Sequence, residues 1–200
     1  MGKKNEKKAR RAAAAVADAD AEVAKAVAPA ARTWPVRLLA WASELGDQPQ
    51  LRLLCGGAIV AGVMTRNERL ARAGVRALAA HEAATAAKNF VKHRVDRARP
   101  RSFLGNRSPA SHKPKPGRNQ GKEETSFPSG HSAGASSVAR AFARDYPEYA
   151  AAAYGTAGLV ALAQIPRSAH YPTDVGAGIA VGLAAEAAVS TLLPRPLVEE

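Results

Sequence analysis

The chain has 200 residues, enough for one domain with a buried core but hardly for two. Alanine is abundant, only 5% of the residues are aromatic, and no stretch alternates apolar and polar residues, so we expect an all-α protein. The formal net charge of +12 indicates an anionic partner: nucleic acid, an anionic membrane surface or a phosphorylated substrate. The single cysteine, Cys55, excludes a disulfide within the chain, and we expect a buried structural thiol.

The first segment, residues 1–33, is basic at its start and then Ala-rich. We expect a mostly exposed helix here, whose lysines and arginines are solvated or contact acidic lipid or nucleic acid. Charged residues interrupt the apolar core that a cleavable signal peptide needs, at Asp18, Asp20, Glu22 and Lys25. We therefore expect no such signal, and we assign residues 34–196 as the folded domain.

The segment that follows favours a short amphipathic helix over residues 34–45, with Trp34 and Trp41 among its apolar anchors. Tryptophans of this kind suit either a membrane interface or an ordinary core. After a turn, the apolar run 53–65 is only 13 residues long. That length is short of the roughly 20 residues needed to cross a bilayer.

A long helix is expected over residues 73–95 from its composition. Lys92 and Arg99 stand seven residues apart, which is two helical turns and therefore one face, and Pro100 stops the helix there. Residues 101–124 are rich in proline, glycine, serine and lysine, so we expect a long loop that is more mobile than the rest.

The most informative stretch, residues 127–132, reads Phe-Pro-Ser-Gly-His-Ser and precedes a run of small helix-forming residues. Ser129, Gly130 and His131 should therefore lie where a loop turns into a helix. The free N–H groups and the dipole of a helix start favour a bound anion, and the imidazole adds a group that titrates near neutrality. Read alone, the same pattern also fits a capped helix with a surface histidine.

Two further helices are expected over residues 149–165 and 173–193. The apolar stretches 149–166 and 175–194, the second interrupted by Glu186, approach the length of a membrane span. Either a marginal span or a buried helix of a soluble bundle accounts for each of them.

Three polar groups stand out from this Ala-rich background: Lys92 with Arg99-Pro100, Pro128 to His131, and His170 with Asp174. Together they provide what phosphoryl transfer needs. Cations and a helix start hold the phosphoryl oxygens, one imidazole attacks phosphorus, a carboxylate orients that imidazole, and the other imidazole protonates the leaving oxygen. Fixed cations make a metal unnecessary, no zinc-ligand spacing is present, and no cofactor is expected.

These residues resemble the type 2 phosphatidate phosphatase superfamily, which also contains bacterial acid phosphatases and vanadium haloperoxidases. Its signature is Lys, six residues, Arg-Pro; then Pro-Ser-Gly-His; then Ser-Arg, five residues, His, three residues, Asp. The matching positions are Lys92 to Pro100, Pro128 to His131, and His170 with Asp174. The resemblance covers about residues 92–182 and implies a helical bundle with the site at its centre.

The resemblance also implies the role of each residue. His170 is expected to be the nucleophile that becomes a phosphohistidine, Asp174 to orient it, and His131 to act as general acid and base. The residues expected to hold phosphate are Lys92, Arg99, Ser129 and Gly130.

One position departs from the family pattern. The Ser-Arg pair falls on Ala163 and Gln164, and a glutamine side chain carries no charge. Arg167 lies three residues further on and reaches the same face if the helix continues that far, although Pro166 makes the local geometry uncertain. We expect Arg167 to have taken over the phosphate contact; the alternative is that the contact was lost, which would give a weaker enzyme, a different substrate or a degenerate site.

The expected function is metal-independent hydrolysis of a phosphomonoester or pyrophosphate. The resemblance, together with the two marginal spans and the tryptophans, implies a lipid substrate and an integral protein of the bacterial inner membrane with several spans. No nucleic-acid partner is expected, and a soluble or peripheral form is kept open by the low hydropathy. Two other classes also stay open. One is a vanadate-dependent haloperoxidase, and the other is a phosphate-binding relic that has lost catalysis.

Overall fold

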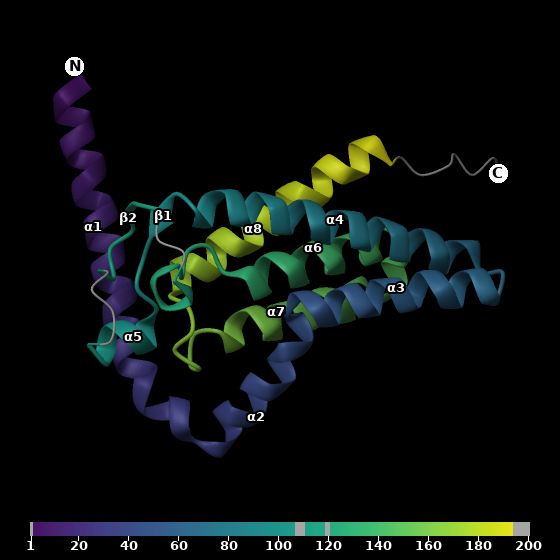
Figure 1. Cartoon of the computed structure of the whole chain (residues 1–200), viewed down its shortest axis with the longest axis horizontal. Coiled ribbons are helices and arrows are strands. Elements are labelled where there is room, and N and C mark those ends of the chain that lie inside the picture. Colours follow the sequence, from purple (N-terminus) through teal and green to yellow (C-terminus); the bar gives the residue numbers. More distant parts are fainter. Residues whose placement is uncertain (1, 107–110, 119–120, 194–200) are drawn as a thin grey trace.

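The Ala-rich segments form long helices, as their composition predicts, in the computed structural model, which describes residues 2–106, 111–118 and 121–193. Figure 1 shows the elongated bundle that results. In chain order the elements are α1 (Gly2–Val27), η1 (Ala28–Arg32), α2 (Trp34–Ser43), η2 (Glu44–Gly46), α3 (Gln48–Met64), α4 (Glu68–Lys92), β1 (Val95–Asp96), α5 (Pro100–Leu104), β2 (Lys115–Pro116), η3 (Lys122–Glu124), α6 (Gly130–Asp145), η4 (Pro147–Tyr149), α7 (Ala150–Ala163) and α8 (Pro172–Leu192).

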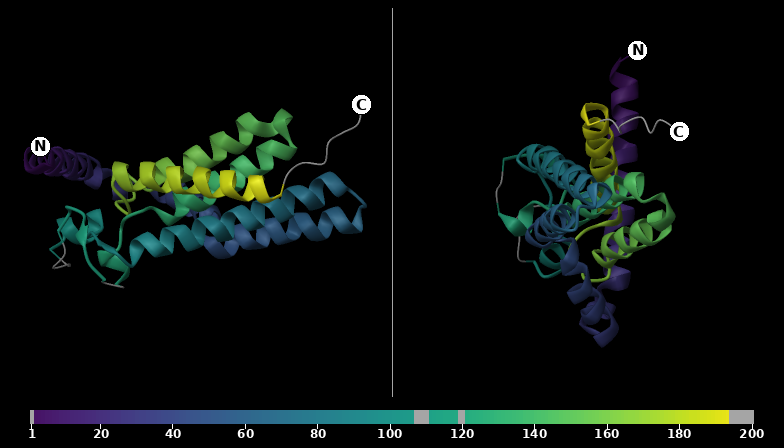
Figure 2. Two further views of the ribbon diagram at one scale, coloured as in Figure 1. Left: turned by 90° about the horizontal axis from the view of Figure 1, so that it is seen from above. Right: turned by 90° about the vertical axis from the view of Figure 1, so that its right-hand side faces the viewer.

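The centre of the bundle is α6, which packs against α4, α7 and α8, while α3 packs on α4 (Figures 1 and 2). Small residues make this close packing possible. A Cβ added at Gly182 on α8 would lie 2.3 Å from the carbonyl oxygen of Ala133 on α6, so only glycine fits there. Cys55 is 2% exposed, which confirms the expected buried thiol.

The N-terminal helix α1 crosses the end of the bundle at which α6 and α8 begin (Figures 1 and 2). Its first half projects into solvent, and its second half buries Ala17, Ala21 and Ala24. The expected helix is therefore present, and part of it is packed rather than solvated.

The helix expected to run on to Pro100 ends earlier, at Lys92. The prediction that Lys92 and Arg99 share a helix face is therefore wrong. The physical reason is that the loop 121–126 supplies other hydrogen-bond partners, since the N–H groups of Arg97 and Arg99 donate to the carbonyls of Glu124 and Glu123 at 2.7 and 2.8 Å.

The loop expected over residues 101–124 has more structure than predicted. It contains most of α5 and all of β2 and η3, and β2 pairs with β1 in an antiparallel ladder. Pro109, one of the prolines that suggested this loop, lies outside the described residues, and the greater mobility of the segment stays a prediction.

Large apolar side chains lie on the outside of the bundle. Trp34 and Trp41 are 76% and 75% exposed, so the core alternative for the two tryptophans is wrong. Other exposed apolar residues on α3 and α7 are Leu53, Leu54, Val60, Val63, Met64, Leu159 and Leu162. Continuous exposed apolar surface is typical of contact with lipid or a protein partner.

Among the described residues, one helix is long and apolar enough to cross a membrane, α8 with its 21 residues. The other predicted stretch, 149–166, gives α7, which has only 14 residues. Pro194, the end of the predicted second stretch, lies outside the described residues.

Candidate active site

The start of α6 forms the expected anion-binding geometry. Ser129 is the N-cap, and its Oγ accepts hydrogen bonds from the backbone N–H and the hydroxyl of Ser132 at 3.4 and 2.9 Å. Gly130 and His131 are the first two residues of the helix, where N–H groups lack partners within the helix. Ser129 is fully buried, so its first role is to cap the helix, and direct contact with phosphate stays a prediction.

Hydrogen bonds join the three motifs at this end of the bundle. The N–H of Ser129 donates to the carbonyl of Asp174 at 2.9 Å. The Lys92 ammonium donates to the carbonyl of Thr125 at 2.6 Å, just upstream of Ser129. One Nη of Arg99 donates to the carbonyl of Ala169, next to His170, at 3.4 Å. These contacts hold the three motifs, which are far apart in sequence, together at one end of the bundle.

His170 and Asp174 form a buried pair, 3% and 0% exposed. His170 Nδ1 lies 3.7 Å from Asp174 Oδ2, which is longer than a hydrogen bond, and the same oxygen accepts from the N–H of Tyr171 at 3.0 Å. Because Nδ1 faces the carboxylate, Nε2 on the other side of the ring is the nitrogen available to a substrate.

The buried position of His170 also sets its charge. Burial lowers the pKa of this imidazole to about 3; Asp174 opposes that effect, while the positive charges of Arg99 and Lys92 add to it. At neutral pH the ring is therefore uncharged, which is the form that carries a free lone pair and acts as a nucleophile.

Arg97, which the sequence analysis missed, holds the carboxylate of Asp174 from the other side. Its guanidinium is fully buried, and Nη1 lies 2.6 Å from Asp174 Oδ1. The same nitrogen donates to Thr173 Oγ1 at 2.8 Å, Nε donates to the carbonyl of His112 at 2.7 Å, and the group lies over the ring of Tyr171. No spacing in the sequence marks Arg97, because its partners come from distant segments.

The cations of the first motif lie beside His170. Arg99 donates from Nε to the carbonyl of Lys122 at 2.7 Å. Burial lowers the pKa of Arg99 to about 10, with the like charges of Arg101 and Arg167 acting in the same direction, so the guanidinium remains charged at neutral pH. Lys92 and Arg99 are thus brought together by the fold, although not on one helix.

A further lysine, Lys88, approaches the start of α6 and was also missed. It is 5% exposed, and its Nζ is 3.6 Å from where a Cβ of Gly130 would be. Within the described part of the chain its ammonium has no hydrogen bond or ion pair. The sequence did hold a signal, since Lys88 lies four residues before Lys92 and hence on the same helix face.

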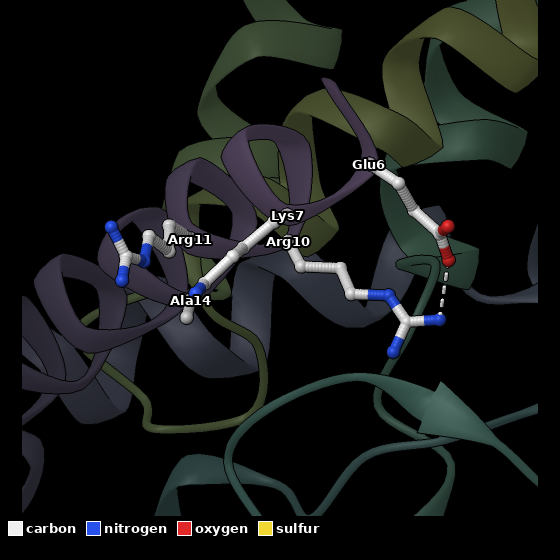
Figure 3. Close-up of a pocket in the computed structure, with 5 residues that line it drawn as sticks. All are labelled: Glu6, Lys7, Arg10, Arg11 and Ala14. Carbon is white, nitrogen blue, oxygen red and sulfur yellow. Dashed lines mark hydrogen bonds and ion pairs between the residues drawn. The ribbon is translucent and has the colours of Figure 1, made fainter. Parts of the chain in front are cut away.

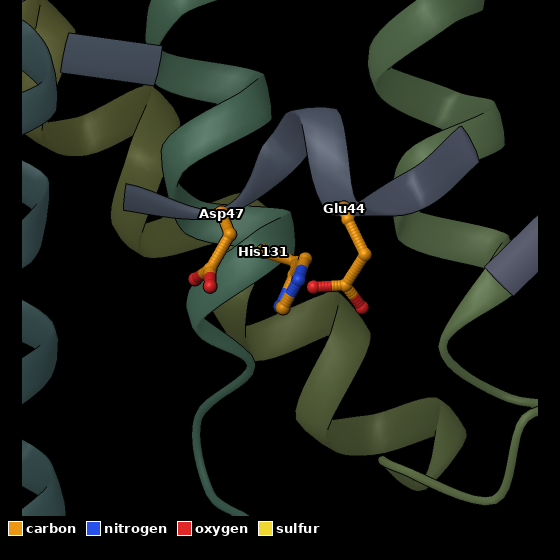
Figure 4. Close-up of side chains that lie close together, drawn as sticks. All are labelled: Glu44, Asp47 and His131. Atoms are coloured by element: carbon orange, nitrogen blue, oxygen red, sulfur yellow. The ribbon is translucent and has the colours of Figure 1, made fainter. Parts of the chain in front are cut away.

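His131 faces two carboxylates from the turn between α2 and α3. Ligand atoms of Glu44, Asp47 and His131 all lie within 4.8 Å of one another (Figure 4). Burial lowers the pKa of His131; the negative charges of Asp47 and Glu44 oppose this effect only in part, and the positive charges of Arg167 and Arg99 add to it. His131 Nε2 is buried and has no hydrogen-bond partner among the described residues.

The same three residues have a geometry that can hold a metal ion, but both carboxylates already have partners. Glu44 pairs with Arg167 at 2.7 Å, and Asp47 caps α3 by accepting from the N–H of Gln48 at 3.0 Å. A cation here would have to displace Arg167 and would occupy the imidazole assigned as acid and base.

Arg167 and Gln164 lie differently from the geometry that the sequence suggested. Helix α7 ends at Ala163, so the helix does not continue to Arg167. Gln164 is fully buried and donates from Nε2 to the carbonyl of Val160 at 2.8 Å, inside its own helix. Arg167 donates to Ser43 Oγ at 3.0 Å besides pairing with Glu44, so it lies beside His131 but is held by other groups.

A shallow depression on the first half of α1 contains none of these residues (Figure 3). Its polar lining includes an Arg10–Glu6 ion pair at 2.7 Å, with both side chains mostly exposed. This is the surface of a solvated basic helix, so the chemistry lies at the other site.

A comparison with protein families shows to which family the chain belongs. The sequence matches the PAP2 superfamily over residues 73–196, more than half of the chain and a range that contains all three motifs. The chain belongs to the PAP2 superfamily. The type 2 phosphatidate phosphatase resemblance of the motifs is thereby confirmed.

The fold agrees with this membership. The structure is similar to the crystal structure of the first transmembrane PAP2 type phosphatidylglycerolphosphate phosphatase from Bacillus subtilis, with a TM-score of 0.66 and 22% sequence identity over 93% of this chain and 90% of that one. At this identity the likeness shows the fold, and the predicted all-α bundle is confirmed. No curated protein matches the sequence.

Proposed function

We propose that this PAP2 protein is a metal-independent phosphatase that hydrolyses a lipid phosphomonoester or pyrophosphate through a phosphohistidine at His170. The observation that carries the proposal is the buried imidazole of His170, which faces Asp174 beside Lys92 and Arg99. An uncharged imidazole is nucleophilic, and fixed cations around it stabilise the charge of the transferring phosphoryl group.

The reaction has two steps. His170 Nε2 forms a bond to phosphorus, the bond from phosphorus to the leaving oxygen breaks, and His131 gives its proton to that oxygen. Water then attacks phosphorus and loses a proton to His131, the phosphorus–nitrogen bond breaks, and inorganic phosphate leaves. Asp174 stabilises the positive charge on the phosphorylated imidazole between the two steps.

The phosphate oxygens are held by the Lys92 side chain, the Arg99 guanidinium and the N–H groups at Gly130. Burial lowers the pKa of Lys92 to about 7, and a bound phosphate anion favours its protonated form. Lys88 joins this set, because a buried ammonium without an anionic partner beside a helix start gains from a bound phosphate. Arg167 is the remaining candidate, and it would have to leave Glu44 at least in part to reach the substrate.

We propose that the protein lies in the inner membrane and crosses it several times. Exposed tryptophans on α2, exposed leucines and valines on α3 and the apolar helix α8, the one candidate span among the described residues, support a membrane location. The similar Bacillus subtilis protein is described as transmembrane and as acting on phosphatidylglycerolphosphate. A phosphorylated lipid is therefore the substrate class that we propose.

Two assays test the function. The purified protein in detergent is given a lipid phosphate with and without excess chelator, and we expect phosphate release to be equal in both. In parallel, substrate labelled in its phosphate should leave an acid-labile label on the wild-type enzyme and none on His170→Ala. Activity that disappears with chelator and returns with magnesium would overturn the mechanism.

The two other classes have their own signatures. Halide oxidation that requires added vanadate and peroxide would indicate a haloperoxidase. Tight phosphate binding without turnover would indicate a relic. The membrane proposal predicts that the protein stays in the membrane pellet after a wash with high salt, because salt weakens charge contacts but not buried apolar spans. Recovery of the protein in the soluble fraction without detergent would contradict this proposal.

A further inference from the structure

We infer that the N-terminal helix α1 contributes to the active site. Its residue Asp20 orients Asp174 through Arg97 and adds a negative charge close to the His170–Asp174 pair. This inference rests on the proposed function. It concerns a segment outside the family match, which begins at residue 73, so nothing in the family relationship assigns a role to α1.

The contacts of Asp20 carry the inference. Its carboxylate is 4% exposed, and Oδ2 lies 2.7 Å from Nη2 of Arg97. Oδ1 accepts from the N–H of Thr173 at 3.2 Å, and the hydroxyl of Thr173 also donates to this carboxylate. Asp20 thus binds the guanidinium that holds Asp174 and the backbone of the residue next to Asp174.

The arrangement forms a continuous line of charged groups. Asp20 contacts Nη2 of Arg97, Nη1 of the same guanidinium contacts Asp174 Oδ1, and Asp174 Oδ2 faces His170. The planar fork of arginine fixes both carboxylates at once, which a point charge cannot do. A displacement of Asp20 would therefore be transmitted to the orientation of Asp174.

The charge of this cluster gives Asp20 a second effect. Arg97 contributes one positive charge, and Asp20 and Asp174 contribute two negative charges, so the buried cluster has a surplus of one negative charge beside His170. When His170 attacks phosphorus its ring becomes positive, and that surplus stabilises the ring. Without Asp20, Arg97 would neutralise Asp174 alone, and the surplus would be lost.

The same helix offers a matched control. Asp18 lies two residues before Asp20, is half exposed, and pairs with His112 and Lys113 at 2.9 Å on the surface. It helps to dock α1 without touching Arg97. Asp18→Asn therefore removes an acidic contact of α1 while leaving the line of charges intact.

The decisive experiment compares Asp20→Asn, Asp18→Asn and the wild type in the full chain. Asp20→Asn keeps the shape of the side chain and removes its charge. We expect phosphohistidine formation in a single turnover to slow about 10- to 100-fold, the size of effect seen when a residue that orients a metal-binding side chain is replaced. KM should change little, because Asp20 does not touch the substrate. Asp18→Asn should keep the wild-type rate, and Asp20→Glu should recover part of it.

A second readout does not depend on turnover. Orthovanadate adopts the five-coordinate geometry of phosphoryl transfer, so it loads the same charge onto His170. We expect Asp20→Asn to bind it about tenfold more weakly and Asp18→Asn to bind it as the wild type does. If the wild type binds vanadate but hydrolyses nothing, the proposed function fails while this comparison still tests the inference.

A purely structural role for Asp20 predicts a different result. In that case Asp20→Asn lowers the melting temperature but leaves the single-turnover rate and vanadate affinity of the folded protein unchanged, and the inference is overturned. Should Asp20→Asn not fold, Arg97→Lys tests the same line of charges, since it keeps the positive charge but cannot bridge both carboxylates. A wild-type rate in Arg97→Lys would equally overturn the inference.

Discussion

Buried arginine–carboxylate contacts occur at both ends of α6, and they differ in the sign of their surplus charge. At the site end, Arg97 lies between Asp20 and Asp174, all of them buried, and the surplus is negative. At the far end, about 22 Å along the helix, Arg72 and Arg76 both bind Asp145, and the surplus is positive.

The difference in exposure explains what each end can do. Arg72 at the far end is 38% exposed, so its extra positive charge is solvated and affects no neighbour strongly. The extra negative charge at the site end is buried, and in the inference above it acts on His170. The same type of contact thus joins helices at one end and, as we infer, supports chemistry at the other.

Glu186 repeats the pattern of the far end. It is fully buried on α8 and binds Arg140 and Arg144 of α6 at 2.7 and 2.6 Å, and both arginines are partly exposed. Glu186, the charged residue that interrupts the predicted membrane span in α8, is therefore explained by its partners on α6.

The largest effect is expected at the site end. His170→Ala should abolish turnover, by on the order of 10⁶ in kcat as for loss of a nucleophile in a comparable covalent mechanism. Asp145→Asn at the far end is the control, and its activity per folded molecule should equal that of the wild type. Residual activity of His170→Ala above a tenth of wild type would mean that another group forms the covalent intermediate.

The far end should show its effect on stability instead. Arg76→Met leaves the buried carboxylate of Asp145 with only the partly exposed Arg72, and it removes the hydrogen bond from Arg76 to the carbonyl of Leu193. We expect the free energy of unfolding to fall by about 3–5 kcal/mol, as for a broken buried pair. Denaturant unfolding and kcat are measured on the same sample, and a fall in kcat of the folded fraction would contradict the division between the two ends.

The sequence predicted the fold well because helix propensity and breakers are local. Ser129 as a cap, the end of α6 before Pro147 and the start of α8 near Thr173 all follow from neighbouring residues. The end of α4 was predicted wrongly because it depends on hydrogen bonds to the carbonyls of Glu123 and Glu124, some 25 residues away. Long-range competition of this kind leaves no local pattern.

The site was predicted in part for the same reason. Fixed spacings predicted both histidines and Asp174 as site residues, and the structure places His170 beside Asp174 and joins Ser129 to the backbone of Asp174. Asp20, Arg97 and the Glu44–Asp47 turn were missed because each acts through partners from another segment. Lys88 is different, since its helical spacing from Lys92 was visible in the sequence.

The third prediction concerns the arginine that departs from the family position. If Arg167 binds phosphate, Arg167→Ala should lower kcat/KM, and the loss of transition-state stabilisation should be ~2–4 kcal/mol, as for loss of a preorganised donor. Its present bonds to Glu44 and Ser43 allow the alternative that it only holds the turn beside His131. Kinetics of Glu44→Gln separate the two, because freeing Arg167 should preserve activity in the first case. A silent Arg167→Ala together with an activating Gln164→Arg would show that the contact was lost rather than moved.

The fourth prediction uses pH to test the buried imidazole at the site end. The pKa of His170 is about 3 in the folded protein and near 6.5 in an unfolded chain. Its contribution to stability is therefore fully present above pH 6.5 and is lost as the pH falls towards 3, by up to about 1.4 kcal/mol per pH unit. His170→Gln should lose less stability than wild type between pH 6.5 and 4.5 in denaturant unfolding. Equal losses would mean that this imidazole is not kept uncharged by the fold.

The smallest effect is expected for Lys88, and it bears on the substrate. Methionine has a similar length, and replacing an unpaired buried ammonium by an apolar group should not destabilise the fold, so Lys88→Met should be well folded. We expect KM to rise about tenfold, which corresponds to the loss of roughly one charge-assisted hydrogen bond.

The measurement compares a lipid monophosphate with the pyrophosphate of the same lipid, and Lys25→Met on the exposed face of α1 is the control. A rise for both substrates means that Lys88 binds the reacting phosphoryl group, whereas a rise for the pyrophosphate alone means that it binds the second phosphate. An unchanged KM for both would remove Lys88 from the site and leave the surplus negative charge behind His170 as the feature that distinguishes this end of the bundle.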